Sequence, residues 1–251
     1  MTTITPETTV AEIATLTPAT IRVFQQHHID FCCGGKIPLT RACAATGVDV
    51  DVILGELRAA AAPAAPEPSW ADASLKSLVE HIQARYHAPL RLELPRLDAM
   101  LDKVVSRHGD QMPDVLLPLQ ETFKRLMQEL LQHMSKEDRV LFPFIVALEA
   151  GQVPATQDAA TWIESPIAML EAEHEDAGAA LAFIRERTAG FAPPEWACPT
   201  FRGLYYGLAQ LETDMHLHVH LENNILFPRA ARLAESRRSA GAKSTCVLPT
   251  H

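Results

Sequence analysis

Apolar residues recur every three or four positions along most of the chain, which is the spacing that predicts amphipathic helices. In the first 58 residues the pattern appears in three short stretches, which begin after Thr9, at Thr17-Pro18 and near Asp49 or Asp51. The segment DFCCGGK at residues 30–36 separates them and predicts a tight turn. We therefore expect a small helical domain at the N-terminus.

Four longer helical patterns follow, separated by glycines and prolines. The expected helices cover residues 72–107, 113–150, 165–190 and 195–235. Long helices with short connections favour an up-down-up-down four-helix bundle, which we place at residues 70–235. The expected fold class is all-α.

Residues 59–69, AAAAPAAPEPS, contain three prolines and cannot form one continuous helix. We interpret them as a linker between an N-terminal domain, residues 1–58, and the bundle. A loop inside a single domain is the alternative. The last residues, 236–251, are expected to form a disordered tail.

Composition narrows the classes of protein that fit this pattern. The net charge of -9, without a basic stripe, argues against a nucleic-acid-binding protein. The sequence has no run of about 18 apolar residues that would cross a membrane, and its start does not resemble a secretory signal. Five cysteines, an odd number in a chain without an export signal, fit a reducing cytoplasm.

Two histidine–glutamate pairs have the same spacing in two of the expected helices. His133 and Glu137 lie in the second helix, and His218 and Glu222 lie in the fourth. Four residues turn an α-helix by about 400°, so the members of each pair lie about 40° apart on one face. One such pair is common on helix surfaces, but two in matching halves of a bundle predict a site for two metal ions, which each glutamate can bridge.

The other two helices carry a histidine at a comparable depth. His87 lies about 21 residues before the first interhelical turn, and His133 about 20 residues after it. His174 lies about 16 residues before the second such turn, and His218 about 23 residues after it. The expected metal ligands are therefore His87, His133, Glu137, His174, His218 and Glu222.

The type of ligand indicates the metal. Imidazole and carboxylate groups without a thiolate favour a non-haem di-iron or di-manganese site over structural zinc. Iron is the better choice because histidines outnumber carboxylates. A carboxylate-rich ferritin-like site would show Glu-x-x-His twice, which this chain does not.

Two further carboxylates lie near the expected ligands. Glu129 precedes His133 by four residues, and Glu173 directly precedes His174. Each is either a relay for protons or ions or simply a solvated charge on a helix surface.

The remaining histidines are expected to lie away from the metals. His108 is about 31 Å from His87 along a continuous helix, so we interpret it as a turn histidine. It is a candidate fifth histidine ligand only if that helix breaks at Pro95. His216 and His220 flank His218 and should face outward or pack elsewhere.

Cys32 and Cys33 are adjacent and are followed by two glycines. They can form a vicinal disulfide, bind a metal or act as redox-active thiolates on a turn. The alternative is that both are small buried apolar residues. We interpret Cys43, Cys198 and Cys246 as incidental.

These motifs together resemble those of the iron–sulfur cluster repair di-iron family. DFCCGGK resembles the family's short N-terminal domain, and the bundle motifs are RYHAPLRLELPRL, HMSKEDRVLFP, LEAEHEDAG and HLENNILFP. The resemblance covers nearly the whole chain, up to about Ala234. It implies a hemerythrin-like four-helix bundle preceded by a small helical domain.

The resemblance also implies a function. It implies two iron ions bound by the four histidines and bridged by Glu137, Glu222 and an oxo group. It implies a cytoplasmic protein, induced by nitric oxide or oxidative stress, that helps to restore damaged clusters by delivering iron. It further implies that Cys32 and Cys33 matter for dimer contacts, in a possible homodimer, or for thiol chemistry.

Three functions fit the same ligand set. The protein donates iron to proteins with damaged iron–sulfur clusters, or it binds nitric oxide or oxygen as a scavenger or sensor, or it reduces nitric oxide to nitrous oxide. The resemblance favours the first, in which the chain is an iron donor rather than a classical enzyme.

Overall fold

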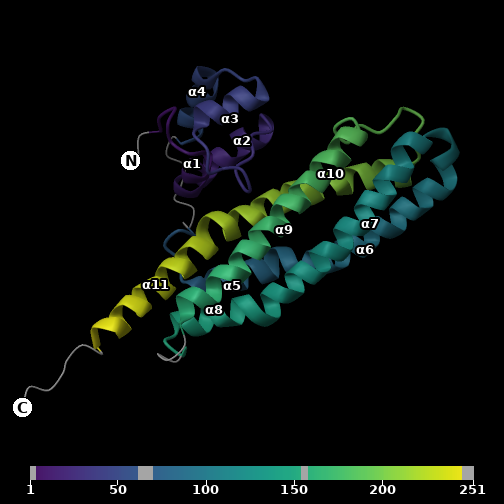
Figure 1. The fold of residues 1–251 in the computed structure, drawn as a ribbon. Coiled ribbons are helices and arrows are strands. Elements are labelled where there is room, and N and C mark those ends of the chain that lie inside the picture. Colours follow the sequence, from purple (N-terminus) through teal and green to yellow (C-terminus); the bar gives the residue numbers. More distant parts are fainter. Residues whose placement is uncertain (1–3, 62–69, 154–157, 245–251) are drawn as a thin grey trace, which may run out of the picture. The chain divides into compact units, whose positions relative to one another are not determined.

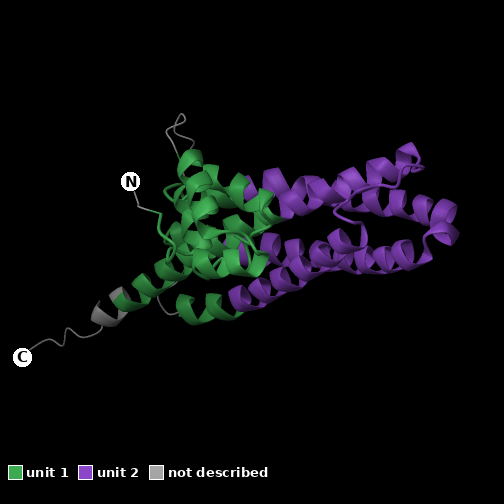
Figure 2. Cartoon of the chain, turned by 90° about the horizontal axis from the view of Figure 1, so that it is seen from above, with its two compact units in different colours: residues 1–79, 145–165, 216–251 green, residues 80–144, 166–215 purple. Residues whose placement is uncertain are grey.

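A computed structural model describes residues 4–61, 70–153 and 158–244 of the 251. Across these residues the secondary structure is helical, apart from one isolated antiparallel bridge between Thr9 and Pro38. This confirms the expected all-α class. Figure 1 labels the helices, and Figure 2 colours the two compact units into which the chain divides.

Unit 1 contains residues 1–79, 145–165 and 216–251, and unit 2 contains residues 80–144 and 166–215. The N-terminal helices, all in unit 1, are α1 (Val10–Leu16), η1 (Pro18–Thr20), α2 (Ile21–Gln26), α3 (Leu39–Thr46) and α4 (Val50–Ala60). Thr9 and Asp49 cap α1 and α4 by accepting backbone N–H groups, as the sequence predicts. The sequence pattern does not predict α3, because LTRACAAT holds one large apolar residue.

The remaining helices are longer and contain three π-helical interruptions, η2, η4 and η5. In chain order the elements are α5 (Leu75–Ile82), η2 (Gln83–His87), α6 (Ala88–His108), η3 (Gly109–Gln111), α7 (Pro113–Lys136), η4 (Glu137–Leu141), α8 (Phe142–Glu149), α9 (Ala159–Arg187), α10 (Pro199–Leu221), η5 (Glu222–Leu226) and α11 (Phe227–Ser244).

Unit 2 is a four-helix bundle built from η2 with α6, from α7 with η4, and from the parts of α9 and α10 that it contains. A polar pair connects each helix to the next around the bundle. These pairs are Lys124–Asp98 (3.2 Å), His133–Glu173 (2.8 Å), Arg185–Glu212 (3.0 Å) and Arg85–Asp214 (3.0 Å). The core that they surround consists of fully buried side chains, among them Leu94, Leu97, Leu101, Phe123, Leu126 and Ile184.

Several segments differ from the expected boundaries. α4 ends at Ala60, so residues 59–60 of the expected linker are helical. α11 continues to Ser244, so residues 236–244 of the expected disordered tail are helical, and an ion pair of 2.8 Å between Glu235 and Arg238 supports the helix there. α9 begins at Ala159, before the expected start, because Asp158 accepts a hydrogen bond from the backbone of the first turn. Residues 62–69 of the expected linker and 245–251 of the tail lie outside the described residues.

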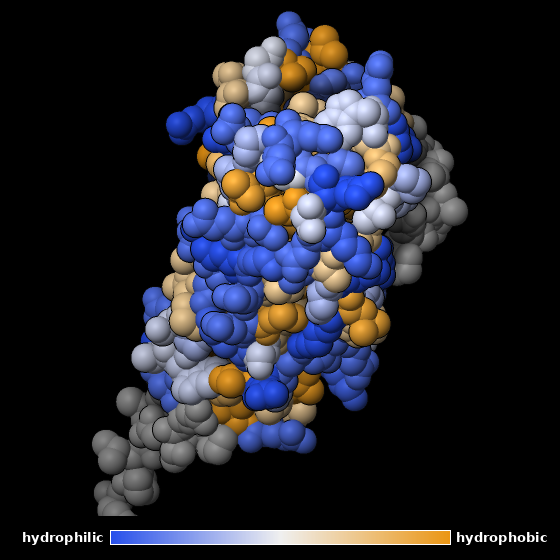
Figure 3. All heavy atoms as spheres, turned by 90° about the vertical axis from the view of Figure 1, so that its right-hand side faces the viewer, coloured by the Kyte–Doolittle hydropathy of each residue, from blue (hydrophilic) through white to orange (hydrophobic). Residues whose placement is uncertain are grey.

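Across the described residues, no helix combines the length and the apolar character that a membrane span requires. On the face drawn in Figure 3, hydrophilic residues predominate and hydrophobic residues occur in small separate groups.

Candidate metal centre

Three of the expected ligands lie at the ends of π-helical segments. His87 ends η2, Glu137 begins η4 and Glu222 begins η5. After each segment, the next backbone N–H donates to the carbonyl five residues earlier, not four. Such π-bulges are frequent at functional sites. The wider turn changes the direction in which the ligand side chain leaves the helix.

A proline lies two residues after the end of each π-helical segment and fits the wider turn there. These prolines are Pro89, Pro143 and Pro228. A proline has no N–H to donate, and in an α-helix its ring clashes with the carbonyl four residues earlier. Each of these carbonyls belongs to the preceding π-helical segment. The sequence Leu-Phe-Pro, which begins four residues after the glutamate of each expected pair, is therefore a usable signal for the bulge.

Unit 2 brings four of the expected ligands together in its interior. His87, His133, Glu137 and His174 are at most 3% exposed. Oε2 of Glu137 lies 3.4 Å from Nε2 of His87 and 3.3 Å from Nε2 of His133. Nε2 of His174 lies 2.9 Å from Nε2 of His133. Ligand atoms of His133, Glu137 and His174 all lie within 4.8 Å of one another.

The chemistry of this cluster fits a metal ion. Both carboxylate oxygens of Glu137 are buried, and neither accepts a hydrogen bond from any described residue. Burying an ionised carboxylate without a hydrogen-bond donor is costly. Two imidazole nitrogens 2.9 Å apart can share only one proton between them. A cation bound to the carboxylate and the imidazoles removes both costs.

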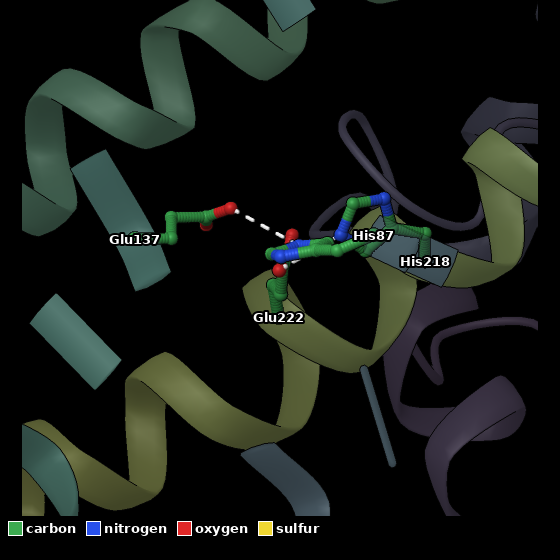
Figure 4. Close-up of side chains that lie close together, drawn as sticks. All are labelled: His87, Glu137, His218 and Glu222. Carbon is green, nitrogen blue, oxygen red and sulfur yellow. Dashed lines mark hydrogen bonds and ion pairs between the residues drawn. The ribbon is translucent and has the colours of Figure 1, made fainter. Parts of the chain in front are cut away.

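Unit 1 carries the second expected pair. Nε2 of His218 lies 2.9 Å from Oε1 of Glu222, and both side chains are at most 1% exposed. Figure 4 shows this pair and the pair of His87 and Glu137, each joined by a dashed line. The two side chains of each pair thus point toward one another inside the protein.

Two further carboxylates hold the outer nitrogens of two of the expected ligand histidines. Oδ1 of Asp138 lies 2.9 Å from Nδ1 of His87, and Oε2 of Glu173 lies 2.8 Å from Nδ1 of His133. A carboxylate at Nδ1 orients the ring and leaves the lone pair of Nε2 for a metal. Sequence reasoning missed Asp138, although it directly follows Glu137.

Asp138 is ionised at neutral pH. Its burial favours a higher pKa, but hydrogen bonds from His87, Gln83 and Arg91 outweigh burial and lower the pKa to about 2. Nε2 of Gln83 donates to Oδ1 at 2.8 Å, and Arg91 forms an ion pair with the other oxygen. This carboxylate therefore accepts bonds from three side chains at once.

A cavity of about 210 Å³ opens beside His133 in unit 2. Its polar lining residues are Glu129, Gln132, His133, Lys136, Glu173 and Asp176. The pKa of Glu173 is lowered: burial opposes the shift, and hydrogen bonds with Lys136 and His133 outweigh it. Glu129 and Glu173 thus share one cavity, and Glu173 contacts His133, one of the expected ligands, directly.

His108 lies at the end of α6, which runs through Pro95 without a break. Its Nδ1 lies 3.3 Å from Oε1 of Gln111, and its ring packs against Trp196 and Phe201. It is a turn histidine, as the length of the helix indicates.

The turn at Cys32 and Cys33 is organised by Asp30. The carboxylate of Asp30 accepts the backbone N–H groups of Cys32, Cys33 and Gly34 at 2.9, 3.0 and 2.8 Å. A Cβ at Gly35 would lie 2.7 Å from a backbone carbonyl oxygen, so the turn requires glycine there. The two cysteines are not joined by a disulfide, and their sulfurs are 3.7 Å apart in a thiol hydrogen bond.

Within unit 1 this turn packs against the segment that carries Glu222. The ring of Phe31 contacts those of His216 and His220, with centroids 6.1 and 5.6 Å apart. Asn224 donates to the carbonyl of Phe31 at 2.9 Å, and Asn223 donates to the next carbonyl at 3.4 Å. The two histidines beside His218 therefore hold the cysteine turn.

Comparison with known proteins covers both parts of the chain. Residues 6–61 match the ScdA_N family, a domain of unknown function, and residues 78–230 match the hemerythrin HHE cation binding domain. The iron-sulfur cluster repair protein YtfE of Yersinia pseudotuberculosis (strain IP 31758) is 38% identical over 220 residues, which cover 88% of this chain and 95% of that protein. The protein of the same name from Pectobacterium carotovorum subsp. carotovorum is 39% identical over 221 residues, with the same shares covered. The chain belongs to the family of iron-sulfur cluster repair proteins and joins an ScdA_N domain to a hemerythrin HHE cation binding domain.

Proposed function

We propose that this chain serves cluster repair as an iron donor. The observation that carries the proposal is the buried carboxylate of Glu137, which lies against the imidazoles of His87 and His133 and accepts no hydrogen bond from the described residues. The proposed ligands of two iron ions are His87, His133, His174 and His218, with Glu137 and Glu222 as bridges.

The donor atoms support iron as the metal. Imidazole nitrogen and carboxylate oxygen suit iron or manganese, whereas a structural zinc site commonly uses cysteine thiolates. Glu137 contacts both His87 and His133, which is what a bridging carboxylate between two ions requires. When bound, iron is the cargo of the repair reaction and supplies its redox chemistry.

The same donor atoms support release. Imidazoles and carboxylates hold iron less firmly than a cage of thiolates does. Glu129 and Glu173 line the cavity beside His133, and we assign them the relay of the ion or of the protons that replace it. A proton must return to each imidazole or carboxylate that loses its metal.

We propose Cys33 as the reactive thiol of the N-terminal turn. The pKa of the Cys32 thiol is raised well above its ordinary value by its hydrogen bond to Cys33, then by burial and by the nearby Asp30. Cys32 is therefore a protonated partner at neutral pH, while Cys33 is half-buried. Two adjacent cysteines in the thiol form are suited to redox exchange.

The proposed clients are proteins with damaged iron–sulfur clusters, as the names of the relatives suggest. Nitric oxide and oxygen are the small ligands expected at the same centre, and a homodimer is the proposed assembly. The described cysteines form no disulfide with one another, which supports work in a reducing cytoplasm.

An iron-transfer experiment tests this function. The protein is loaded with the iron isotope 57, freed of unbound metal and mixed with a cluster-depleted dehydratase, a sulfide source and a reductant. We expect the isotope to appear in the client and its activity to return. A client that stays inactive while both irons stay on the donor contradicts the proposal.

The control for that experiment uses the same amount of iron added with a chelator that matches the protein's affinity. Faster repair from the protein than from this buffer separates delivery from simple leakage. Gas binding that is tight and reversible, without loss of iron or repair of the client, would favour a nitric oxide or oxygen sensor.

A further inference from the structure

The ligands within unit 2 divide into two sets. His133 and His174 face one another through Nε2 atoms 2.9 Å apart, so they serve one metal position. His87 approaches Glu137 independently, with 3.4 Å between Nε2 and Oε2. Glu137 reaches both sets. The surroundings of the two positions can therefore be compared within one compact unit.

The surroundings of His87 are closed. Its ring is fully buried and stacks on Phe142 at 5.5 Å, with 14° between the ring planes. Its outer nitrogen is held by Asp138, whose side chain is 18% exposed. Asp138 is itself fixed by Gln83 and Arg91. To move away from a metal, His87 must leave its stack on Phe142 and break its bond with Asp138, which Gln83 and Arg91 hold in place.

The surroundings of His133 are open. Its outer nitrogen is held by Glu173, whose side chain is 31% exposed. The other ion-pair partner of Glu173 is Lys136, which is 40% exposed, and both side chains line the cavity of about 210 Å³. Water or an acceptor can enter there, and Glu173 can move with His133 without breaking a buried network.

We propose that the two metal positions are unequal by construction: Asp138 retains the ion at His87, and the ion between His133 and His174 is the one that is given up. The inference rests on the proposed function, since it names which ion an iron donor releases. Asp138 is a positioning residue in this view, because it acts through His87 and does not contact the metal itself. A carboxylate that fixes the tautomer and direction of a ligand histidine, and is itself held by other side chains, slows the loss of that ligand.

Release to a chelator tests the proposal. The protein is loaded with two ferrous ions, excess ferrous chelator is added under anaerobic conditions, and the coloured complex is followed in time. We expect two phases of equal amplitude. In Asp138→Asn the slow phase should accelerate by about tenfold or more, because second-layer partners commonly change metal affinity by that factor. Asp138→Glu should recover most of the slow phase.

Matched variants assign the phases. Glu173→Gln should change the fast phase and leave the slow one, and Asp176→Asn, in the same cavity, should change neither. His133→Ala should leave one slowly released ion, and His87→Ala one rapidly released ion. Circular dichroism of the metal-free variants checks that each is folded. If Asp138→Asn does not fold, Gln83→Ala takes its place, because it removes a hydrogen bond that holds Asp138.

Release of both ions in a single phase from the unaltered protein would overturn the proposal. So would a slow phase that Asp138→Asn does not change in a folded protein. The outcome is independent of cluster repair: two phases with no repair of a client leave the inequality standing and reject donation. Repair of a client together with release in a single phase would support donation and reject the inequality.

Discussion

At the scale of single residues, the cysteines of this chain differ in acidity because their neighbours differ. Cys198 directly precedes α10, where a hydrogen bond from the backbone of Phe201, then one with His108, lowers the pKa of its thiol. Cys32 has the opposite surroundings, and its pKa is raised. A group with a lowered pKa is present as thiolate at a lower pH.

Alkylation should therefore separate these two thiols. We expect Cys198 to reach its half-maximal rate with iodoacetamide below the ordinary thiol pKa of about 8.5, and Cys32 to reach it well above that value. Mass spectrometry of peptides after short pulses at pH 6 to 10 measures both rates in one sample. His108→Ala should move the midpoint of Cys198 upward and leave that of Cys32 in place. Equal midpoints for the two thiols would contradict the account.

Glu137 shows how a residue can oppose folding and still be required. Its charge is buried against imidazoles and has no hydrogen-bond donor among the described residues. Glu137→Gln should therefore stabilise the metal-free protein, by about 1–3 kcal/mol, because it removes the uncompensated charge. The same substitution should abolish the stabilisation that iron gives. Urea unfolding of both proteins, with and without iron, measures this, and a less stable metal-free variant would refute it.

At the scale of elements, proline and glycine positions decide the local backbone. Three prolines follow the three π-helical segments, whereas Pro95 lies inside α6 without one. The difference provides a matched pair of substitutions. It separates the general cost of a helical proline from the role of a π-bulge in placing a ligand.

Pro143→Ala should allow η4 to relax toward an α-helix and rotate Glu137 away from its partners. We expect iron affinity to fall by about tenfold or more while the fold persists. Pro95→Ala should keep full iron affinity and gain up to about 3 kcal/mol from helix propensity. Competition with a calibrated chelator gives the affinities. Equal affinities in the two variants would show that the bulge does not place the ligand.

Two glycines in the N-terminal part give a second matched pair. A Cβ at Gly35 would overlap a backbone oxygen, whereas a Cβ at Gly55, inside α4, would meet nothing within 4 Å. Gly35→Ala should destabilise unit 1 by about 1–3 kcal/mol, and Gly55→Ala should stabilise it by about 1 kcal/mol. Thermal unfolding of the metal-free proteins distinguishes the two signs. Destabilisation of similar size in both would contradict the turn geometry.

Sequence spacing predicts much of the candidate site because an α-helix has a constant rise and rotation per residue. The spacing of His133 and Glu137 places both on one face, and counting from the turns places His87 and His174 at a similar depth. It does not reveal Asp138, because the partner of a side chain on another helix depends on packing. A count of residues along the sequence also treats the π-helical segments as α-helical, and therefore does not predict the wider turn at each one.

The helix boundaries show the same limit. α3 is formed by small residues whose pattern is weak, and its packing in the N-terminal core, not its propensity, supports it. The extension of α11 past the expected end depends on local ion pairs that a search for apolar periodicity does not count.

At the scale of the whole molecule, a cation-binding domain and a cysteine-bearing domain belong to one chain of a cluster repair family. The contacts of Phe31 with the histidines beside Glu222 connect the cysteine turn to the helix of a proposed bridging ligand. We propose that the buried histidines and glutamates of this chain hold two irons. Every proposal about delivery depends on it.

Metal analysis with Mössbauer spectroscopy of the anaerobically purified protein tests that claim most directly. Glu137→Ala is the test variant, and Glu121→Ala, an exposed carboxylate of the same helix, is its control. We predict about two irons per chain with the signals of exchange-coupled ferric ions, as expected for a bundle-core di-metal site. The control should keep them, and Glu137→Ala should lose them. Zinc, or no metal in any of the three proteins, would contradict the account.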